Sequence, residues 1–386
     1  IYFYKKIKMK AQASETIRKE FAHIDALYFN TAYFGPSPYR AKQKVSNALF
    51  KELDPSFTAY NTWMGIPDRI RTQIAKLLQV SPDNIALQSS TTDVISIVAN
   101  GYKLKSDEAV TTLNKEYPSN VLPWMLLKKN TGINLNMLET TMPTAEWLAD
   151  NLPKNTKIFN ISFVTFDTGK KIDLISIGKL MKERDIFFIV DATQALGGMP
   201  ITEEELQYID VLSCSCYKWL LGPYGTAFAY FSDEAIKKIE HKTGNWINSI
   251  NSKNVYDLLN YTLETLPGAR KFDRGQAPNM LANACLEASL ELLNFIGLDE
   301  IEKHNHEIRN HFLDIFPKKK YELITPKEHM ANIVCLKVKN LDPVELEREL
   351  KHNLIDVSVR QGNIRLSFHL FNTKNQVDTL AQTLDI

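Results

Sequence analysis

The chain of 386 residues lacks the features of membrane, secreted and nucleic-acid-binding proteins. No stretch approaches the ~20 apolar residues that a membrane-spanning helix requires. Residues 1–10 alternate aromatic side chains with lysines and have no apolar run before a small-residue cleavage site, so we expect no signal peptide. The 46 Lys and Arg residues balance the 45 Asp and Glu residues, which removes the electrostatic reason for binding nucleic acid or an anionic membrane.

Cysteine is also scarce, and its placement argues against a metal site. The four cysteines are Cys214, Cys216, Cys285 and Cys335, and no second pair of ligands lies near the C-x-C pair to complete a zinc site. The eight histidines are scattered without a metal-binding spacing, so we expect no metal. We interpret the cysteines as buried free thiols and expect a reducing, cytoplasmic location.

What the sequence does contain is a repeated helix-then-strand pattern. Apolar strands are predicted over residues 84–89, 109–113, 157–164, 186–191, 209–215 and 226–231. Helices are predicted over residues 67–80, with Pro67 in the first turn, and over 91–100, 119–129 and 174–184. This alternation predicts an α/β fold with a mostly parallel sheet covered on both faces. After about residue 281 the pattern changes to long helices and short mixed elements, typical of a smaller α+β domain.

Polar residues follow three of the predicted strands, at the edge of the sheet where ligands bind in α/β proteins. Hydroxyls at the start of a helix, including Thr91 and Thr92, suit a phosphate or cap the helix. Asp191 ends the most apolar strand, where it faces the expected crevice or caps the next turn. Lys218 stands beside aromatic residues, and it is a nucleophile if burial lowers its pKa or otherwise a solvated surface lysine.

These residues occur within motifs that resemble the aminotransferase class V family of fold-type I pyridoxal-phosphate (PLP) enzymes. That family includes cysteine desulfurases, kynureninases, isopenicillin-N-epimerase-like proteins and C–S lyases. The matching motifs are N-T-A (30–32), S-T-T-D (90–93), E-Y-P-S-N-V-L-P-W (116–124), D-L-I-S-I-G-K-L (173–180), D-A-T-Q (191–194), S-C-Y-K (215–218), G-P-Y-G (222–225), F-D-R-G (272–275) and R-L-S-F-H-L-F-N-T (365–373). The resemblance implies a large PLP-binding domain over residues 41–280, a small C-terminal domain over residues 281–386, and an N-terminal segment, residues 1–40, that packs with the small domain.

The resemblance also implies a role for each matching residue. Lys218 would carry PLP as a Schiff base and then move protons at the substrate Cα, and Asp191 would keep the ring nitrogen protonated. Arg365 would grip the α-carboxylate of an amino-acid substrate, with Asn30 also in the substrate site. Further cofactor contacts would come from Thr91, Thr92, Tyr117, Gln194, Ser215, Tyr217 and Gly275. A homodimer with its active sites at the subunit boundary is implied as well.

Departures from the family pattern bear on the reaction. Residues 360–365 contain no cysteine, which argues against sulfur transfer through an enzyme persulfide. Phe163 stands where the family often has asparagine, and Gln276 where it has a threonine that reaches the neighbouring phosphate. We therefore expect a PLP-dependent enzyme that acts at the α-carbon of an amino acid, first of all an aminotransferase. C–S or C–C lysis and epimerisation are the alternatives, and a catalytically silent regulatory homologue is disfavoured.

Overall fold

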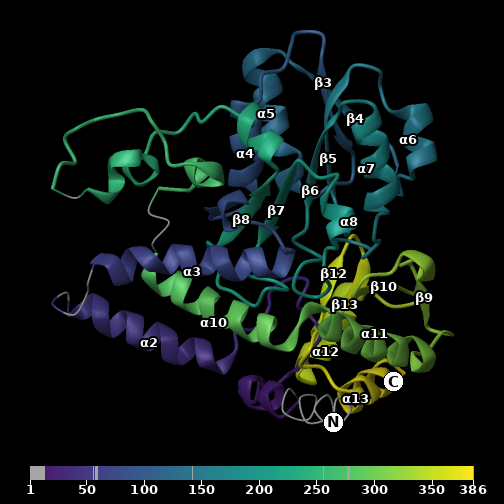
Figure 1. Ribbon diagram of the computed structural model, residues 1–386. Coiled ribbons are helices and arrows are strands. Elements are labelled where there is room, and N and C mark those ends of the chain that lie inside the picture. The colour runs from purple at the N-terminus through teal and green to yellow at the C-terminus, as the bar shows by residue number, and fades with distance from the viewer. Residues whose placement is uncertain are drawn as a thin grey trace, which may run out of the picture.

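The computed structural model describes residues 14–54, 56, 60–140, 142–254, 256–275 and 279–385 (Figure 1). The expectation about a signal peptide falls on residues 1–10 and the departure at Gln276 on a gap, so both lie outside the described residues. No single helix in the described ranges has the length and apolar composition to cross a membrane. The helices Met280–Ile296 and Leu298–Ile315, which are bent relative to each other, meet the length and composition criteria only when they are counted together. The cytoplasmic location stays a prediction.

A seven-stranded sheet forms the centre of the larger part of the molecule. Its strands, in spatial order, are β2 (Ile85–Gln88), β8 (Ala227–Phe231), β7 (Val211–Ser215), β6 (Phe187–Asp191), β5 (Thr156–Ser162), β3 (Ala109–Leu113) and β4 (Asn134–Leu138). Neighbouring strands are parallel except around β8, which is antiparallel to both β2 and β7. Residues 216–226, which join β7 to β8, are too few for a crossover helix. The predicted, mostly parallel sheet is confirmed.

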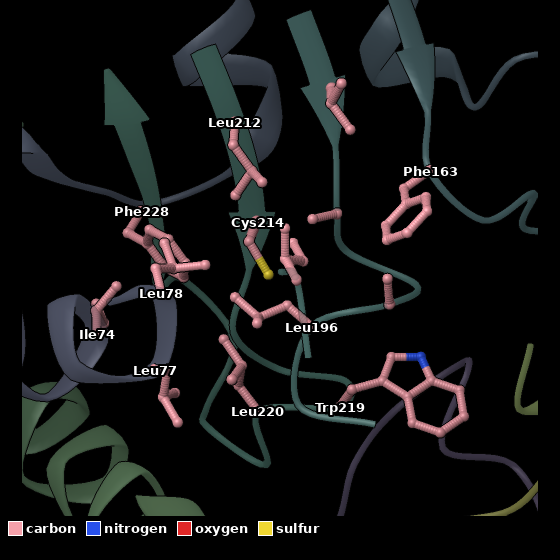
Figure 2. Close-up of a cluster of buried hydrophobic side chains, with 14 of the residues drawn as sticks. Ile74, Leu77, Leu78, Phe163, Leu196, Leu212, Cys214, Trp219, Leu220 and Phe228 are labelled. Carbon is pink, nitrogen blue, oxygen red and sulfur yellow. The ribbon is translucent and has the colours of Figure 1, made fainter. Parts of the chain in front are cut away.

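Helices cover both faces of this sheet, because its central strands are apolar on both sides. In β6, Phe188 and Val190 enter one core together with side chains of α3 (Tyr60–Leu78) and α7 (Leu174–Glu183). Figure 2 shows part of this core around Leu212 and Trp219. Phe187 and Ile189 enter the other core, with α4 (Thr91–Gly101), α5 (Leu122–Thr131) and α9 (Asp233–Lys238).

The helix predicted to begin at Pro67 begins earlier, at Tyr60, so Pro67 lies inside α3. Ile66, Ile70 and Ile74 lie on one side of the helix, on both sides of the proline in sequence, and pack into the core. This packing determines where the helix begins more strongly than the local preference of proline for a first turn. α3 and α2 (Tyr39–Leu53) both pack against α10 (Met280–Ile296), as Figure 1 shows. Two further short helices are α6 (Ala145–Asn151) and α8 (Glu203–Leu206). 3-10 turns lie at Pro82–Asn84, Pro118–Asn120, Trp246–Asn248, Ile250–Lys253, Gly268–Phe272 and Lys327–His329.

A four-stranded antiparallel sheet forms the smaller α+β part. Its order is β12 (Ser358–Arg360), β13 (Asn363–Ser367), β10 (Ile333–Val338) and β9 (Tyr321–Leu323). Helices α11 (Leu298–Ile315), α12 (Pro343–His352) and α13 (Lys374–Leu384) share its core. The domain boundaries at residues 40 and 280 stay predictions.

The segment ahead of α2 connects the smaller sheet to the end of β7. β1 (Leu27–Tyr28) pairs in parallel with β11 (Ile355–Asp356), and the Ala32 N–H donates to Ser367 Oγ at 2.9 Å. Farther along, the Gly35 N–H donates to the Tyr217 carbonyl at 2.8 Å. A Cβ atom at Gly35 would lie 1.8 Å from the Lys218 carbonyl oxygen, so this approach requires glycine.

Candidate active site

A cavity of about 230 Å³ opens at the carboxyl ends of β2, β5, β6 and β7. In open α/β sheets this edge is where ligands bind. The walls combine hydroxyl groups, aromatic rings, one carboxylate and one amine. They are formed by Ser89, Ser90, Thr91, Tyr117, Ser119, Ser162, Val164, Phe166, Asp191, Thr193, Gln194, Ser215, Tyr217, Lys218, Tyr224 and Gly225.

Lys218 is the amine of this cavity, and it is 6% exposed. Its Nζ atom lies 5.3 Å from the centre of the Tyr117 ring and 5.6 Å from that of Tyr217. Burial, and after it the positive charge of Arg365, lower the pKa of Lys218 to about 7. The neighbouring Trp219 is fully buried in the core of Figure 2 and anchors the segment. A neutral amine, which is the nucleophilic form, is therefore present near neutral pH.

Asp191 supplies the carboxylate at the end of β6, where the burial of the strand withdraws it from solvent. Its Oδ1 atom accepts a hydrogen bond from the Thr193 N–H at 2.9 Å, and its Oδ2 atom accepts one from Asn120 Nδ2 at 3.3 Å. Burial raises the pKa of Asp191, while Thr193 and the charge of Lys218 act in the opposite direction. A buried carboxylate on a cavity wall is a binding partner for a cationic ring nitrogen.

Gln194 is held in place from two sides. Its Nε2 atom donates to the Ala32 carbonyl at 3.0 Å, and its Oε1 atom accepts from the Trp219 indole N–H at 2.9 Å. An amide nitrogen carries two hydrogens, so one N–H of Gln194 remains for a ligand in the cavity.

The N-terminus of α4 forms a polar end of the cavity. Ser90 caps the helix, because its hydroxyl oxygen accepts from the Asp93 N–H at 3.1 Å, and Thr91 is the first helical residue. The helix dipole and the N–H groups of the first turn attract an anion such as a phosphate. Ser215 and Tyr217 add hydroxyl groups to the cavity from the end of β7.

Arg365 lies on β13 and carries unused hydrogen-bonding capacity, although it is only 2% exposed. Its Nη1 atom donates to the carbonyl of Phe166, a residue of the cavity wall, at 2.5 Å. Among the described residues, none accepts a hydrogen bond from its Nε or Nη2 atom. Burial, and after it the charge of Arg360, lower the pKa of Arg365 to about 9. Two free donors on one buried guanidinium match the two oxygens of a carboxylate.

A family model described as aminotransferase class-V matches residues 57–380. The chain belongs to this family. A probable cysteine desulfurase of Methanothermobacter thermautotrophicus is 23% identical to it, over 96% of this chain and 97% of its own length. The uncharacterized aminotransferase YcbU of Bacillus subtilis is 23% identical over 87% of this chain and 88% of its own.

Solved structures share the fold of this class-V enzyme. The cystine C–S lyase C-DES, solved in complex with its reaction product cysteine persulfide, has a TM-score of 0.86 at 18% identity and covers 95% of this chain and 98% of its own. The apo cysteine desulfurase of Thermococcus onnurineus has a TM-score of 0.83 at 20% identity, with coverages of 96% and 97%. The predicted fold-type I architecture is confirmed.

The cofactor of this class-V enzyme is pyridoxal phosphate. The residues of the cavity fit that group. A buried amine with a lowered pKa, a buried carboxylate, an aromatic ring beside the amine and a helix N-terminus line one space, and these match the aldehyde, the ring nitrogen, the ring face and the phosphate of PLP.

The structure brings most of the predicted cofactor residues together. Thr91, Tyr117, Asp191, Gln194, Ser215, Tyr217 and Lys218 all line the cavity. Outside this lining, Thr92 donates to Ser119 Oγ at 2.9 Å, and the Asn30 amide donates to Asp356 Oδ1 at 2.8 Å, so Asn30 ties β11 to the N-terminal segment. Gly275 lies in a neighbouring pocket beside Asn245. The roles assigned to these residues stay predictions.

Sequence reasoning missed two residues next to the cavity, Glu116 and Asn120. Asn120 Nδ2 lies within hydrogen-bonding distance of Glu116 at 3.0 Å and of Asp191 at 3.3 Å. The signal was an acid and an amide four residues apart, on either side of Pro118, in the motif that we used for Tyr117 alone.

Proposed function

We propose that this class-V enzyme is a C–S lyase, which cleaves the bond between Cβ and sulfur in a sulfur-containing α-amino acid and passes no sulfur to a cysteine of its own. The observation that carries the proposal is the burial of all four cysteines, in a chain similar to proteins named for C–S bond cleavage. This is one of the alternatives to transamination that the sequence left open, and the comparisons favour it over the preferred aminotransferase.

A persulfide-carrying cysteine must be accessible and must ionise, and the environments of the four thiols oppose both. Cys214, Cys216 and Cys335 are fully buried, and Cys285 is 8% exposed. In Figure 2 the Cys214 sulfur lies within the apolar core. Burial raises the pKa of both Cys216 and Cys335 to about 12. Sulfur is therefore proposed to leave in a small-molecule product.

The residues of the cavity, together with Arg365, which lies outside its lining and contacts Phe166 of the wall, are proposed to carry out such a reaction. The free Nε and Nη2 donors of Arg365 bind the substrate carboxylate. PLP supplies an electron sink, which acidifies the Cα–H bond. Lys218, with a pKa of about 7, accepts the Cα proton as a neutral amine. Asp191 would hold the proton of the ring nitrogen, and Tyr117 would contact the ring.

The phosphate end of the cofactor has its own proposed set of contacts. The N–H groups at the start of α4, together with the hydroxyl groups of Thr91, Ser215 and Tyr217, bind the phosphate. Gln194 donates its remaining N–H to the phenolic oxygen of the ring.

Transamination is the second candidate, because the same residues serve it and relatives such as YcbU are called aminotransferases. Product analysis separates the two reactions. Purified enzyme is incubated with L-cystine, L-cysteine and S-alkylcysteines, with and without a 2-oxo acid. A lyase forms pyruvate and ammonia in equal amounts without an acceptor, whereas an aminotransferase consumes substrate only when the 2-oxo acid is added.

The sulfur route is tested in the same incubations by alkylation and mass spectrometry. We expect no persulfide on any of the four cysteines. A persulfide trapped on one of them during turnover of L-cysteine would contradict the proposal, even if pyruvate were also formed.

We propose, as part of this function, a homodimer. Apolar side chains are unusually exposed on the stretch between α9 and α10, which extends from the body at the left of Figure 1. They include Trp246, Leu259, Tyr261 and Leu263, the last being 98% exposed. Such a concentration of exposed apolar groups marks an interaction surface. Light scattering is expected to give a dimer, and an active, PLP-containing monomer would defeat the proposal.

A further inference from the structure

Four side chains form one hydrogen-bonded cluster across the carboxyl ends of β3, β5 and β6. Glu116 Oε1 accepts from the Ser162 N–H at 2.8 Å, and Oε2 accepts from the Ser162 hydroxyl at 2.6 Å. Asn120 Nδ2 lies 3.0 Å from Glu116 Oε2, 3.1 Å from Ser162 Oγ and 3.3 Å from Asp191 Oδ2. A single amide nitrogen therefore connects two carboxylates, of which only Asp191 has a role in the proposed function.

The hydrogen-bond partners of Glu116 are those that suit an ionised carboxylate. Every hydrogen bond described for its carboxylate is donated to it, by the Ser162 N–H and hydroxyl, by Asn120, and by the Tyr117 N–H at 3.2 Å. A carboxylate accepts all of these, whereas a carboxylic acid must also donate. The pKa of Glu116 is nevertheless raised, because burial outweighs the hydrogen bonds from Ser162 and Asn120, which lower it, and the charge of Asp191 adds to the rise.

We propose that Glu116 is a positioning residue for the cofactor: through Asn120 it orients Asp191, and its negative charge strengthens the hold of the PLP ring nitrogen on its proton. The inference rests on the proposed contact of Asp191 with that nitrogen. Two carboxylates that share one amide nitrogen in a site withdrawn from water repel each other, and both are stabilised by a positive charge close by. In the proposed function that positive charge is the protonated ring nitrogen, because burial favours the neutral amine of Lys218 and the cofactor would be bonded to it.

The decisive measurement is the protonation of the ring nitrogen in the resting holoenzyme. Wild type and Glu116→Gln are loaded with PLP carrying ¹⁵N in the ring, and the nitrogen chemical shift is followed as pH rises. In Glu116→Gln the nitrogen is expected to lose its proton at a lower pH, with its proton affinity reduced roughly tenfold, which is about one pH unit.

Two control variants separate charge from structure. Glu146→Gln removes an exposed carboxylate on α6 and is expected to leave the nitrogen titration unchanged. Ser162→Ala removes one donor to Glu116 and keeps its charge, so its shift is expected to be much smaller than that of Glu116→Gln. A wild-type titration in Glu116→Gln, or an equal shift in Ser162→Ala, would overturn the inference.

A variant with the charge retained covers the case in which Glu116→Gln does not fold. Glu116→Asp withdraws the carboxylate from Asn120 by one methylene. The pH at which the ring nitrogen loses its proton is therefore expected to lie between the wild-type value and the value expected when the charge is removed. An unchanged titration in Glu116→Asp would count against the inference as clearly as one in Glu116→Gln.

Asp191→Asn shows whether a negative result concerns the role of Glu116 or the proposed contact between Asp191 and the ring nitrogen. If that variant leaves the nitrogen titration unchanged, the proposed place of Asp191 is wrong. If Asp191→Asn lowers the pH at which the ring nitrogen loses its proton and Glu116→Gln does not, only the role of Glu116 is wrong. Because no substrate is present, the result does not depend on which reaction the enzyme catalyses.

Discussion

Replacing Lys218 by methionine in the cofactor-free enzyme should stabilise the fold below pH 7 and lose this effect in alkali. Burial and the charge of Arg365 lower the pKa of Lys218 from 10.5 to about 7, so the native state disfavours the charged amine. One pH unit corresponds to about 1.36 kcal/mol, so the free energy of unfolding is reduced by on the order of 5 kcal/mol when the amine is charged in both states. Methionine fills a similar volume and carries no charge.

The sign of the pH dependence follows from the two pKa values. Below pH 7 the amine is charged in the native and unfolded states, and the native state bears the full cost. As pH rises from 7 to 10.5 the native amine is already neutral, so the cost falls, and above 10.5 it is gone because both states are neutral. The stability gained in Lys218→Met should therefore be several kcal/mol in acid and small in alkali.

Urea unfolding of wild type and Lys218→Met across this pH range, at one fixed protein concentration, measures the difference. Lys129→Met, at an exposed position of α5, is the matched control and should show a small difference that does not vary with pH. A constant difference for Lys218→Met, or a wild type that is the more stable protein below pH 7, would refute the reasoning.

Three further substitutions test other parts of the molecule. Asp191→Asn should keep PLP, as read by its absorbance, but lose several kcal/mol of transition-state stabilisation, and an unchanged kcat would remove Asp191 from its role. Arg365→Lys should raise KM at least roughly tenfold, because an ammonium cannot replace the two free N–H donors, and a wild-type KM would argue against carboxylate binding there. Asp273→Asn should lower the free energy of unfolding by about 3–5 kcal/mol, since it removes the nearer carboxylate, 2.9 Å from the buried Arg71, and leaves only the exposed Asp68 at 3.6 Å. A free energy of unfolding, from urea titration, within about 1 kcal/mol of the wild-type value would contradict this.

Much of the fold follows from the pattern of apolar and polar residues along the chain. The apolar run that ends at Asp191 predicted a buried strand, and β6 is that strand, because residues apolar on both faces can be satisfied only between two layers of helices. β4 was missed, since its residues Asn134–Leu138 are partly exposed at the edge of the sheet and its pattern lacks a continuous apolar run. Pro67 was misplaced because packing of α3 against the core outweighs the local preference of one residue.

The sequence by itself also predicted several of the residues that line the cavity. Asp191 ends β6, and Thr91 and Lys218 come shortly after β2 and β7. These three strands run in the same direction and end at the same edge of the sheet, so position along the chain already implies proximity in space. Family motifs at the same places strengthened that prediction.

Only the tertiary structure decided what each group can do. The free donors of Arg365 exist because a carbonyl of Phe166, 199 residues away in the chain, takes one of its N–H groups and leaves the others. The low pKa of Lys218 and the inert environment of the cysteines depend on burial by distant segments. The link from Glu116 to Asp191 depends on one amide between three strand ends. Hydrogen bonding and desolvation are set by atoms that meet only after the chain has folded, and no spacing in the sequence records them.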